Sequence, residues 1–154
     1  MILITSAAYL QGEFVSEVGL LPPSFLSIGN VRLYEYQIKF LQSLEIIDKD
    51  IYLSVPRSYN MDLFDKARIK SLGANIISVP DELSLGNSIL YCWNSSGKQN
   101  ELLTLLHGDT LFLNSNFKEC DSLSVHTNRG FYHRAAIGEK VDAFEDLQTE
   151  WSTD

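Results

Sequence analysis

One short segment combines residues that could do chemistry with a position where a ligand could reach them. The segment His107–Thr110 (His-Gly-Asp-Thr) directly follows the apolar run Leu102–Leu106. A run this short, without polar alternation, predicts a strand buried on both faces of a parallel sheet. In open α/β sheets, ligands bind beyond the carboxyl ends of the strands, which places Asp109 where a cation or substrate would be met. The alternative is a plain turn, because Gly-Asp is a common turn dipeptide.

Two further groups of polar residues are candidate sites. Asn87 and Ser88 stand at the predicted start of a helix and could hydrogen-bond a base or a sugar hydroxyl, but an N-cap alone would also explain them. Cys120, His126 and His133 are spaced by six and seven residues, which fits no common zinc pattern. No Ser-His-Asp or Cys-His arrangement is evident, so the sequence assigns no catalytic residue.

Strands and helices are predicted to alternate along most of the chain. Short apolar runs predict strands, and apolar residues at helical spacing predict helices. The predicted strands are Ile2–Thr5, Ile51–Val55, Ala74–Val79 and Glu101–Leu106, and the predicted helices are Val31–Leu44, Met61–Leu72 and Ser88–Trp93. The apolar stripe of the first helix includes one amide, Gln37. This alternation predicts an α/β fold with a mostly parallel, Rossmann-like sheet and helices on both faces.

The remaining segments determine the expected domain boundaries. Residues 9–30 are irregular and contain several Gly and Pro residues, which predicts a long functional or mobile loop. Asn60 is the expected N-cap of the second helix, and Gly73 is expected just past its end. Leu123–His126 and the segment 130–144 predict further strands. We therefore expect one domain over residues 1–145 and an acidic tail over residues 146–154.

The composition limits the kinds of partner. The chain of 154 residues has 12 Lys and Arg against 20 Asp and Glu, and a formal net charge of −8. An acidic surface without a Lys/Arg cluster repels phosphate backbones, so we expect no nucleic-acid polymer as a partner. Cys92 and Cys120 are expected to be reduced, buried thiols of a cytoplasmic protein, and the less favoured alternative is a single disulfide in a secreted one. Met1–Thr5 is too short for a signal peptide, and no apolar run is long enough to span a bilayer.

Several segments, taken in order, resemble the sugar-phosphate nucleotidyltransferase family. They are Ile2–Phe14, Pro22–Asn30 running into Leu33–Gln37, Leu83–Leu90 and Leu103–Phe112. In that family the matching segments are a strand with an Ala-Ala-Gly-x-Gly-x-Arg phosphate loop and a Pro-Lys-x-Leu-Leu-x-Ile-Gly-Asn-like segment entering a helix. Next comes a loop that precedes a helix, and this helix holds the base and the sugar. The last matching segment is a hydrophobic strand that ends in Gly-Asp-Thr.

The resemblance implies a function in making nucleotide sugars, such as those used for bacterial surface or capsular polysaccharides. It implies that Asp109 binds the catalytic Mg²⁺, since this ion takes one or two carboxylates together with substrate phosphates. It also implies a nucleotide or sugar phosphate as the small-molecule partner. The residues that it places around the nucleotide are Ser6, Ala7, Ala8, Gly12, Asn87 and Ser88.

The chain departs from the family at the positions that approach phosphate. Tyr9 and Gln11 stand at the two glycine positions, Glu13 at the arginine position and Pro23 at the lysine position. Because nucleotidyl transfer depends on positioning and electrostatic stabilisation, losing both cations should reduce the rate by several orders of magnitude. Three cations could replace them from elsewhere in the fold: Arg32, Arg57 and Lys98.

Three functions therefore stay open. The first is a Mg-dependent nucleotidyltransferase. The second is a catalytically inactive relative that binds a metabolite, a partner chain or a second copy of itself. The third, ranked last, is a GT-A-type glycosyltransferase, because Asp109-Thr-Leu lacks the usual Asp-x-Asp. The family normally continues into a longer sugar-binding half, of which this sequence contains only a segment resembling the start, Val141–Asp146.

Overall fold

The computed structural model describes residues 1–44 and 50–111, all within one compact unit, Met1–Asn114. The predicted strands Leu123–His126 and 130–144, the acidic tail and Cys120 lie outside the described residues.

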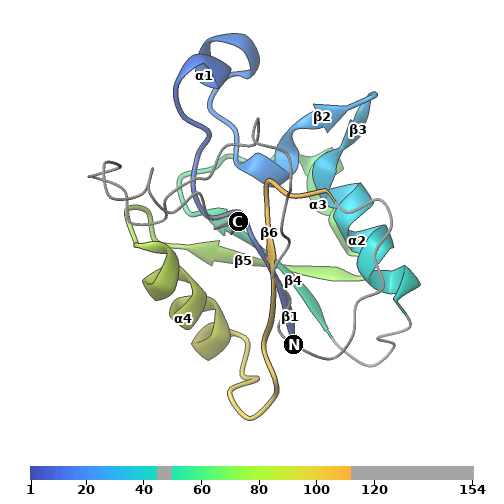
Figure 1. The fold of residues 1–154 in the computed structure, drawn as a ribbon, viewed down its shortest axis with the longest axis vertical. Helices are drawn as coiled ribbons and strands as arrows, with labels where there is room; N and C mark the ends of the chain where they lie inside the picture. The colour runs from blue at the N-terminus through green and yellow to red at the C-terminus, as the bar shows by residue number, and fades with distance from the viewer. Residues whose placement is uncertain (45–49, 112–154) are drawn as a thin grey trace, which may run out of the picture. The chain divides into compact units, whose positions relative to one another are not determined.

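A four-stranded parallel sheet forms the centre of this unit (Figure 1). Its strands are β1 (Ile2–Thr5), β4 (Ile51–Pro56), β5 (Ala74–Val79) and β6 (Thr104–His107), in the order β5-β4-β1-β6. The central strand β1 pairs with β4, with Ile2 opposite Ile51, and with β6, with Thr5 opposite His107. The prediction of an α/β fold with a mostly parallel sheet is confirmed.

Helices cover both faces of this sheet (Figure 1). The helices are α2 (Leu33–Ser43), α3 (Leu63–Ser71) and α4 (Leu85–Ser95). Successive residues of a strand point to opposite faces, so Ile2 and Ile4 pack with α2 and α3, whereas Leu3 packs with α4. Strand β1 is therefore buried on both sides, and its carboxyl end is a fixed reference for the loops that follow the strands.

Strand β6 differs from its prediction. Leu105 is 45% exposed and Leu106 is buried, so the strand is not buried on both faces. Within the described residues it pairs with β1 alone, and Leu102, which precedes it, is 82% exposed. A short apolar run fits several environments, and here it lies at the edge of the sheet that the described residues form.

The segment predicted to be irregular contains local structure. It includes α1 (Glu13–Val18), the 3₁₀ turn η1 (Pro23–Phe25) and a hairpin of β2 (Ser27–Ile28) and β3 (Val31–Arg32). Gly29 and Asn30 both have positive φ, at 56° and 66°, as a two-residue type I′ hairpin turn requires. The hairpin occupies Val31 and Arg32, so α2 begins two residues later than predicted.

The helix starts also differ from the sequence prediction. The N-cap of α3 is Asp62, not Asn60, and its side chain accepts a hydrogen bond from the backbone N–H of Asp65. The N-cap of α4 is Ser84, three residues before the predicted position, and it accepts from the backbone N–H of Asn87. Gly73 follows the end of α3 with φ of +76°, as predicted.

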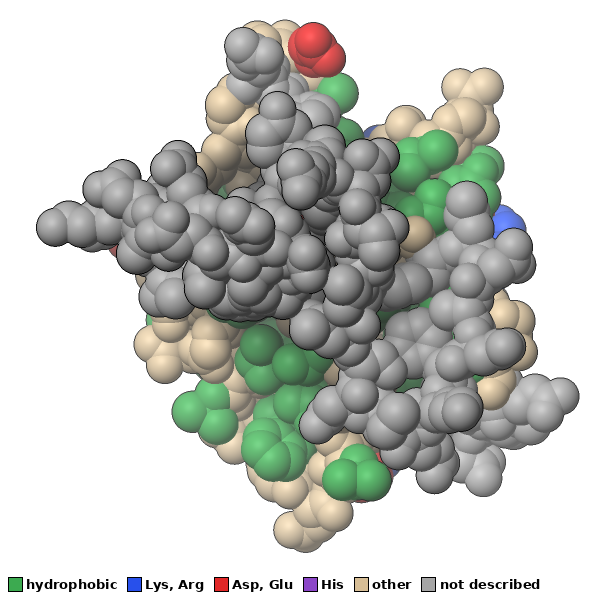
Figure 2. Space-filling model, in the orientation of Figure 1, with side chains coloured by type: hydrophobic (Ala, Val, Ile, Leu, Met, Phe, Trp, Pro, Cys, Tyr) green, Lys and Arg blue, Asp and Glu red, His purple; other side chains and the backbone are tan. Residues whose placement is uncertain are grey.

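Several large apolar side chains reach the surface. Figure 2 shows hydrophobic side chains exposed on the side of the molecule that carries α4, where Leu85 and Leu90 are each about half exposed. At the start of α3, Leu63 and Phe64 are also exposed. None of the helices in the described ranges is long and apolar enough to cross a bilayer.

Candidate functional site

The carboxyl ends of β1 and β6 meet closely at Gly108. A Cβ added to Gly108 would lie 2.4 Å from the carbonyl oxygen of Thr5 and 2.9 Å from the Cβ of Ser6. The backbone N–H of Gly108 donates to the same Thr5 carbonyl, at 2.9 Å. Only glycine fits this approach, so the Gly-Asp dipeptide does more than form a turn. It brings Asp109 next to the residues that follow β1.

Two buried serines connect this junction to η1. The backbone N–H of Ser24 donates to Oγ of Ser6 at 3.0 Å, and Oγ of Ser24 donates to the carbonyl oxygen of Gly108 at 3.0 Å. The backbone N–H of Ser6 donates in turn to Oγ of Ser54 on β4. The hydroxyls of Ser6 and Ser24 are thus used inside the protein, where they fix the loops relative to the sheet.

Gln37 of α2 holds the segment His107–Thr110 from the other side. Its Nε2 lies 2.9–3.1 Å from three backbone carbonyl oxygens of that segment. The side chain is almost completely buried, and its Oε1 has no hydrogen-bond partner in the described part of the chain. The amide that lies on an otherwise apolar stripe therefore fixes the backbone that carries Asp109.

Asp109 itself is exposed, directly after β6. Oγ1 of Thr110 donates to its Oδ1 at 3.2 Å. Residues 1–44 and 50–111 contain no group of three or more His, Cys, Asp or Glu side chains that could hold a metal ion. A single carboxylate suits the mode of Mg²⁺ binding in which phosphate oxygens and water supply the other ligands.

A chain of hydrogen bonds joins the loops that follow β1, β4 and β5. Oγ of Ser58 donates to Oδ1 of Asp81 at 2.8 Å, and Oη of Tyr9 lies 2.8 Å from Oγ of Ser58. Because a hydroxyl carries one proton, and that of Ser58 goes to the carboxylate, Tyr9 is the donor to Ser58. We call Tyr9, Ser58 and Asp81 the loop latch. The ring of Tyr9 also meets that of Tyr59 edge-on, at 6.4 Å.

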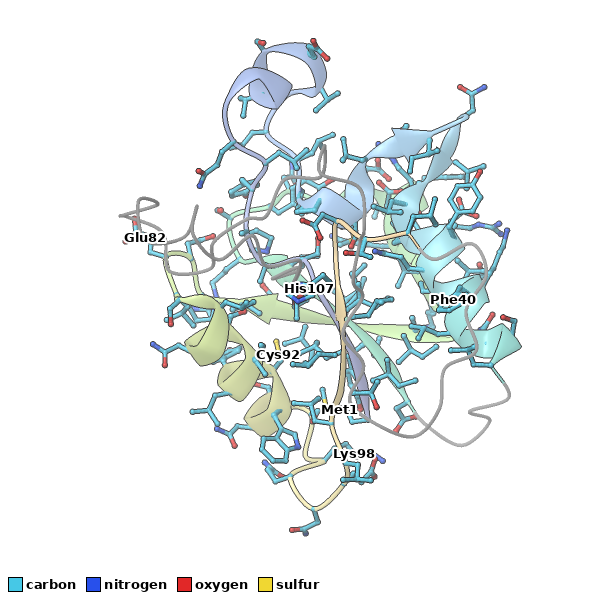
Figure 3. All side chains as sticks on the ribbon, viewed as in Figure 1. Met1, Phe40, Glu82, Cys92, Lys98 and His107 are labelled. Carbon is cyan, nitrogen blue, oxygen red and sulfur yellow. The ribbon has the colours of Figure 1, made fainter. Side chains whose placement is uncertain are left out.

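The three cations that could replace the missing ones lie in different places. Lys98 lies beside Met1, at the amino end of β1 (Figure 3), where it pairs with Asp50 and Glu101. Arg32 donates to the carbonyl oxygen of Phe25 at 2.7 Å and lies 3.6 Å from the buried Asp65. Arg57 is exposed and directly follows β4. Only Arg57 of these three is both at the carboxyl edge and exposed.

The residues predicted around the nucleotide lie in varied environments. Ser6 and Ser88 are buried, Ala7 is half-buried against the α4 face, and Ala8, Gly12 and Asn87 are exposed. Ser88 lies in the second turn of α4 and its backbone N–H donates to the carbonyl oxygen of Ser84. These six assignments and that of Asp109 remain predictions. The loop latch was not foreseen, because its members lie 49 and 23 positions apart in the sequence.

A second polar cluster lies between α2 and α3. Oη of Tyr34 donates to Oδ1 of Asp65 at 2.7 Å, while Oδ2 of Asp65 is buried and has no partner among the residues described. Burial raises the pKa of Asp65, although the Tyr34 hydroxyl and Arg32 act in the opposite direction. Burial and the hydrogen bond to Asp65 also raise the pKa of Tyr34. Nearby, Arg68 pairs with Glu35 at 2.6 Å, so this cluster joins the two helices.

Comparison with known proteins adds no relative. No family model, no curated protein and no solved structure matches this chain. The relation to sugar-phosphate nucleotidyltransferases therefore stays a prediction from the sequence segments.

Proposed function

We propose that this chain is a nucleotidyltransferase-like domain that binds a nucleotide or sugar phosphate, with Mg²⁺, beyond the carboxyl ends of β1, β4 and β6. One observation carries the proposal. Asp109 follows a parallel strand, and the contact of Gly108 with Thr5 holds it at the end of the central strand. The two N–H groups of the Gln37 amide, shared among three backbone carbonyl oxygens, hold that position. Binding sites need this kind of preorganisation.

The strand order supports the same proposal. The order β5-β4-β1-β6 is 3-2-1-4 when only the strands of the parallel sheet are numbered, as in doubly wound nucleotide-binding sheets. In such sheets the order reverses beside the first strand, and ligands bind in the crevice at that reversal. Here the reversal lies between β1 and β6, next to Asp109.

The chemistry of such a site needs no protein nucleophile. In the transfer that the resemblance implies, a phosphate oxygen of the sugar phosphate attacks the α-phosphorus of a nucleoside triphosphate, and pyrophosphate leaves. Asp109 would hold Mg²⁺, which offsets the charge of the phosphates. The residues after β1 would lie along the nucleotide.

Titration calorimetry tests this function. Wild-type protein is titrated with each nucleoside triphosphate, with and without Mg²⁺, and pyrophosphate release is measured with a panel of sugar phosphates. Asp109→Asn should remove the Mg²⁺-dependent part of nucleotide binding. Asp50→Asn is the matched control, because it makes the same change at the amino edge of the sheet, where Asp50 pairs with Lys98. Equal Mg²⁺ dependence in wild type and Asp109→Asn would refute the proposal.

A second candidate is a domain that binds without transferring. Pro23, at the family lysine position, is the first residue of η1 and places Ser24 in the interior. Tyr9, at a glycine position, uses its side chain in the loop latch. The apolar side chains on α4, and strand β6 at the edge of the described sheet, would then suit a partner chain or a second copy.

Two measurements separate the candidates. The double variant Glu13→Arg with Pro23→Lys restores the family's cations. If it gains nucleotide binding or pyrophosphate release that the natural chain lacks, the natural chain is an inactive relative. Light scattering after size-exclusion chromatography tests self-association, and a monomer at all concentrations would exclude the second copy.

A further inference from the structure

We propose that Arg57 is the phosphate-binding cation of this site, and that it contacts the phosphate groups of the ligand from the β4 side. This inference rests on the proposed function, because it assigns the residue that offsets the ligand's negative charge. It places the phosphates over the ends of β4 and β1, outside the segment that resembles a phosphate loop.

The backbone fixes Arg57 at the carboxyl edge of the sheet. Arg57 follows Pro56, the last residue of β4, and its backbone N–H donates to the carbonyl oxygen of Val79, the last residue of β5, at 2.7 Å. Arg57 therefore stands where two neighbouring strands end. That edge is where ligands of parallel sheets bind.

The guanidinium is oriented but not neutralised. Nη2 of Arg57 donates to Oη of Tyr91 on α4 at 3.2 Å. No carboxylate lies within ion-pair distance of Arg57 in the described ranges. An arginine side chain carries five N–H donors, so most of them stay available for a phosphate group, which a guanidinium can bind with two parallel hydrogen bonds.

Other cations of the described part are engaged elsewhere. Arg68 is paired with Glu35, Lys98 with Asp50 and Glu101, and Arg32 with Asp65. Lys70 is exposed near the carboxyl end of α3. A helix that links parallel strands runs opposite to them, so Lys70 lies towards the amino edge of the sheet. Lys39 lies 3.9 Å from Glu35, and Lys66 is exposed on the first half of α3. Arg57 differs from these cations because it directly follows a strand of the sheet, at the carboxyl edge.

The spacing of the strands relates Arg57 to Asp109. Neighbouring strands lie about 4.8 Å apart, so the ends of β4 and β6, with β1 between them, lie roughly 10 Å apart. A polyphosphate with its sugar can extend across such a distance. Arg57 would then hold one phosphate group, while Asp109 would reach another through Mg²⁺.

The loop latch supplies an internal test of this placement. Asp81, which accepts from Ser58, the neighbour of Arg57, puts a negative charge near the proposed phosphate position. Its charge opposes an anion, whereas its hydrogen bond with Ser58 needs only an acceptor. Asp81→Asn keeps a carbonyl oxygen for Ser58 and removes the charge. Asp81→Asn should therefore strengthen phosphate binding, whereas Arg57→Ala should weaken it.

Calorimetry with defined probes tests the inference. The probes are pyrophosphate, uridine triphosphate and glucose 1-phosphate, each with and without Mg²⁺, and uridine as the probe without phosphate. Arg57→Ala should weaken binding of the phosphate compounds tenfold to a hundredfold. This range corresponds to the loss of about 1.5–3 kcal/mol that is typical of a hydrogen bond to a charged group. Arg57→Lys should restore part of the lost affinity, since lysine keeps the positive charge but lacks the planar guanidinium that binds two phosphate oxygens at once. Lys70→Ala, which removes the same charge elsewhere, should leave affinity unchanged.

The outcomes separate this inference from the proposed function. If Arg57→Ala binds every phosphate compound as wild type does, the inference is overturned, even where Asp109→Asn loses Mg²⁺-dependent binding and the proposed function stands. If Arg57→Ala loses pyrophosphate binding and Asp109→Asn changes nothing, the inference stands and the proposed function fails. If wild-type protein binds none of the phosphate probes, both are overturned. The relative affinities of the triphosphate and the sugar phosphate show which source of phosphate the site takes.

Discussion

Replacing Gly108 with alanine should strongly destabilise the protein. The new methyl group would lie 2.4 Å from the carbonyl oxygen of Thr5, about 1 Å closer than ordinary contact allows. The oxygen belongs to the backbone of the central strand, so it cannot move aside as a flexible side chain would. The ends of β1 and β6 must separate instead, which weakens the hydrogen bonds that Ser24 and Gln37 donate to the Gly108 carbonyl.

The size of the effect follows from these two costs. Overpacking a well-packed site costs about 1–3 kcal/mol, and each weakened hydrogen bond adds about 0.5–1.5 kcal/mol. We expect the free energy of unfolding to fall by about 2–6 kcal/mol. Urea denaturation followed by circular dichroism measures it, with the midpoint shifted to lower urea and the slope unchanged.

Gly86→Ala is the matched control for Gly108→Ala. Gly86 lies in the first turn of α4, and a Cβ there would meet nothing within 4 Å. Neither glycine has a positive φ, so backbone strain opposes neither substitution, whereas the space for a Cβ differs greatly between the two positions. Gly86→Ala should stabilise the protein by about 0.4–1 kcal/mol. If both variants have the same stability, the close approach at Gly108 does not hold the site together.

Three further predictions test other parts of the structure. Gln37→Leu should lower the free energy of unfolding by about 1–3 kcal/mol, because it removes the amide that donates to the backbone carbonyl oxygens of the segment His107–Thr110. Urea denaturation measures this change, and a change below about 0.5 kcal/mol would contradict the prediction. Burial raises the pKa of Asp65 above its ordinary value, so the folded state binds the carboxyl proton more tightly than the unfolded state does. The free energy of unfolding therefore falls as the pH rises from the ordinary pKa to the raised pKa of the folded state. The unfolding free energy of Asp65→Asn minus that of wild type should therefore increase from pH 4 to pH 7; a decrease would refute the reasoning. Burial raises the pKa of Cys92 to about 11, so in a Cys120→Ser background iodoacetamide at pH 8 should alkylate the folded protein far more slowly than the urea-unfolded one, and equal rates would show an accessible thiol.

The sequence predicts this fold where local pattern and burial agree. Ile51–Val55 and Ala74–Val79 are apolar runs stopped by Pro, and both are strands whose bounds differ from the prediction by at most one residue. The hairpin turning at Gly29 and Asn30 was missed because its strands have two residues each, too few for any periodicity. The exposure of Leu105 follows from the place of β6 in the sheet, which pattern does not determine.

The candidate site could be predicted in position but not in its contacts. Asp109 was identified because a carboxylate after a strand is a local signal. Gln37 carried a signal too, as an amide on an apolar stripe, but its partners lie some 70 positions away. The hydrogen bonds of Tyr9 and Asp81 depend on which strands are neighbours. Such contacts become visible only when the order of the sheet is known.

The hydrogen bonds of the loop after β1 support the proposed position of phosphate binding near β4. A backbone loop binds phosphate when glycines let its N–H groups approach and cations stand beside it. Here the backbone N–H groups of Ser6 and Leu10 donate to Oγ of Ser54 and to the carbonyl oxygen of Leu21, and Tyr9 ties the loop to Ser58 through its side chain. Donors engaged in this way must break internal bonds before they bind a ligand. The exposed guanidinium of Arg57 needs no such exchange, so a chain that keeps phosphate binding at this edge should depend on Arg57 more than on the loop that resembles the family's.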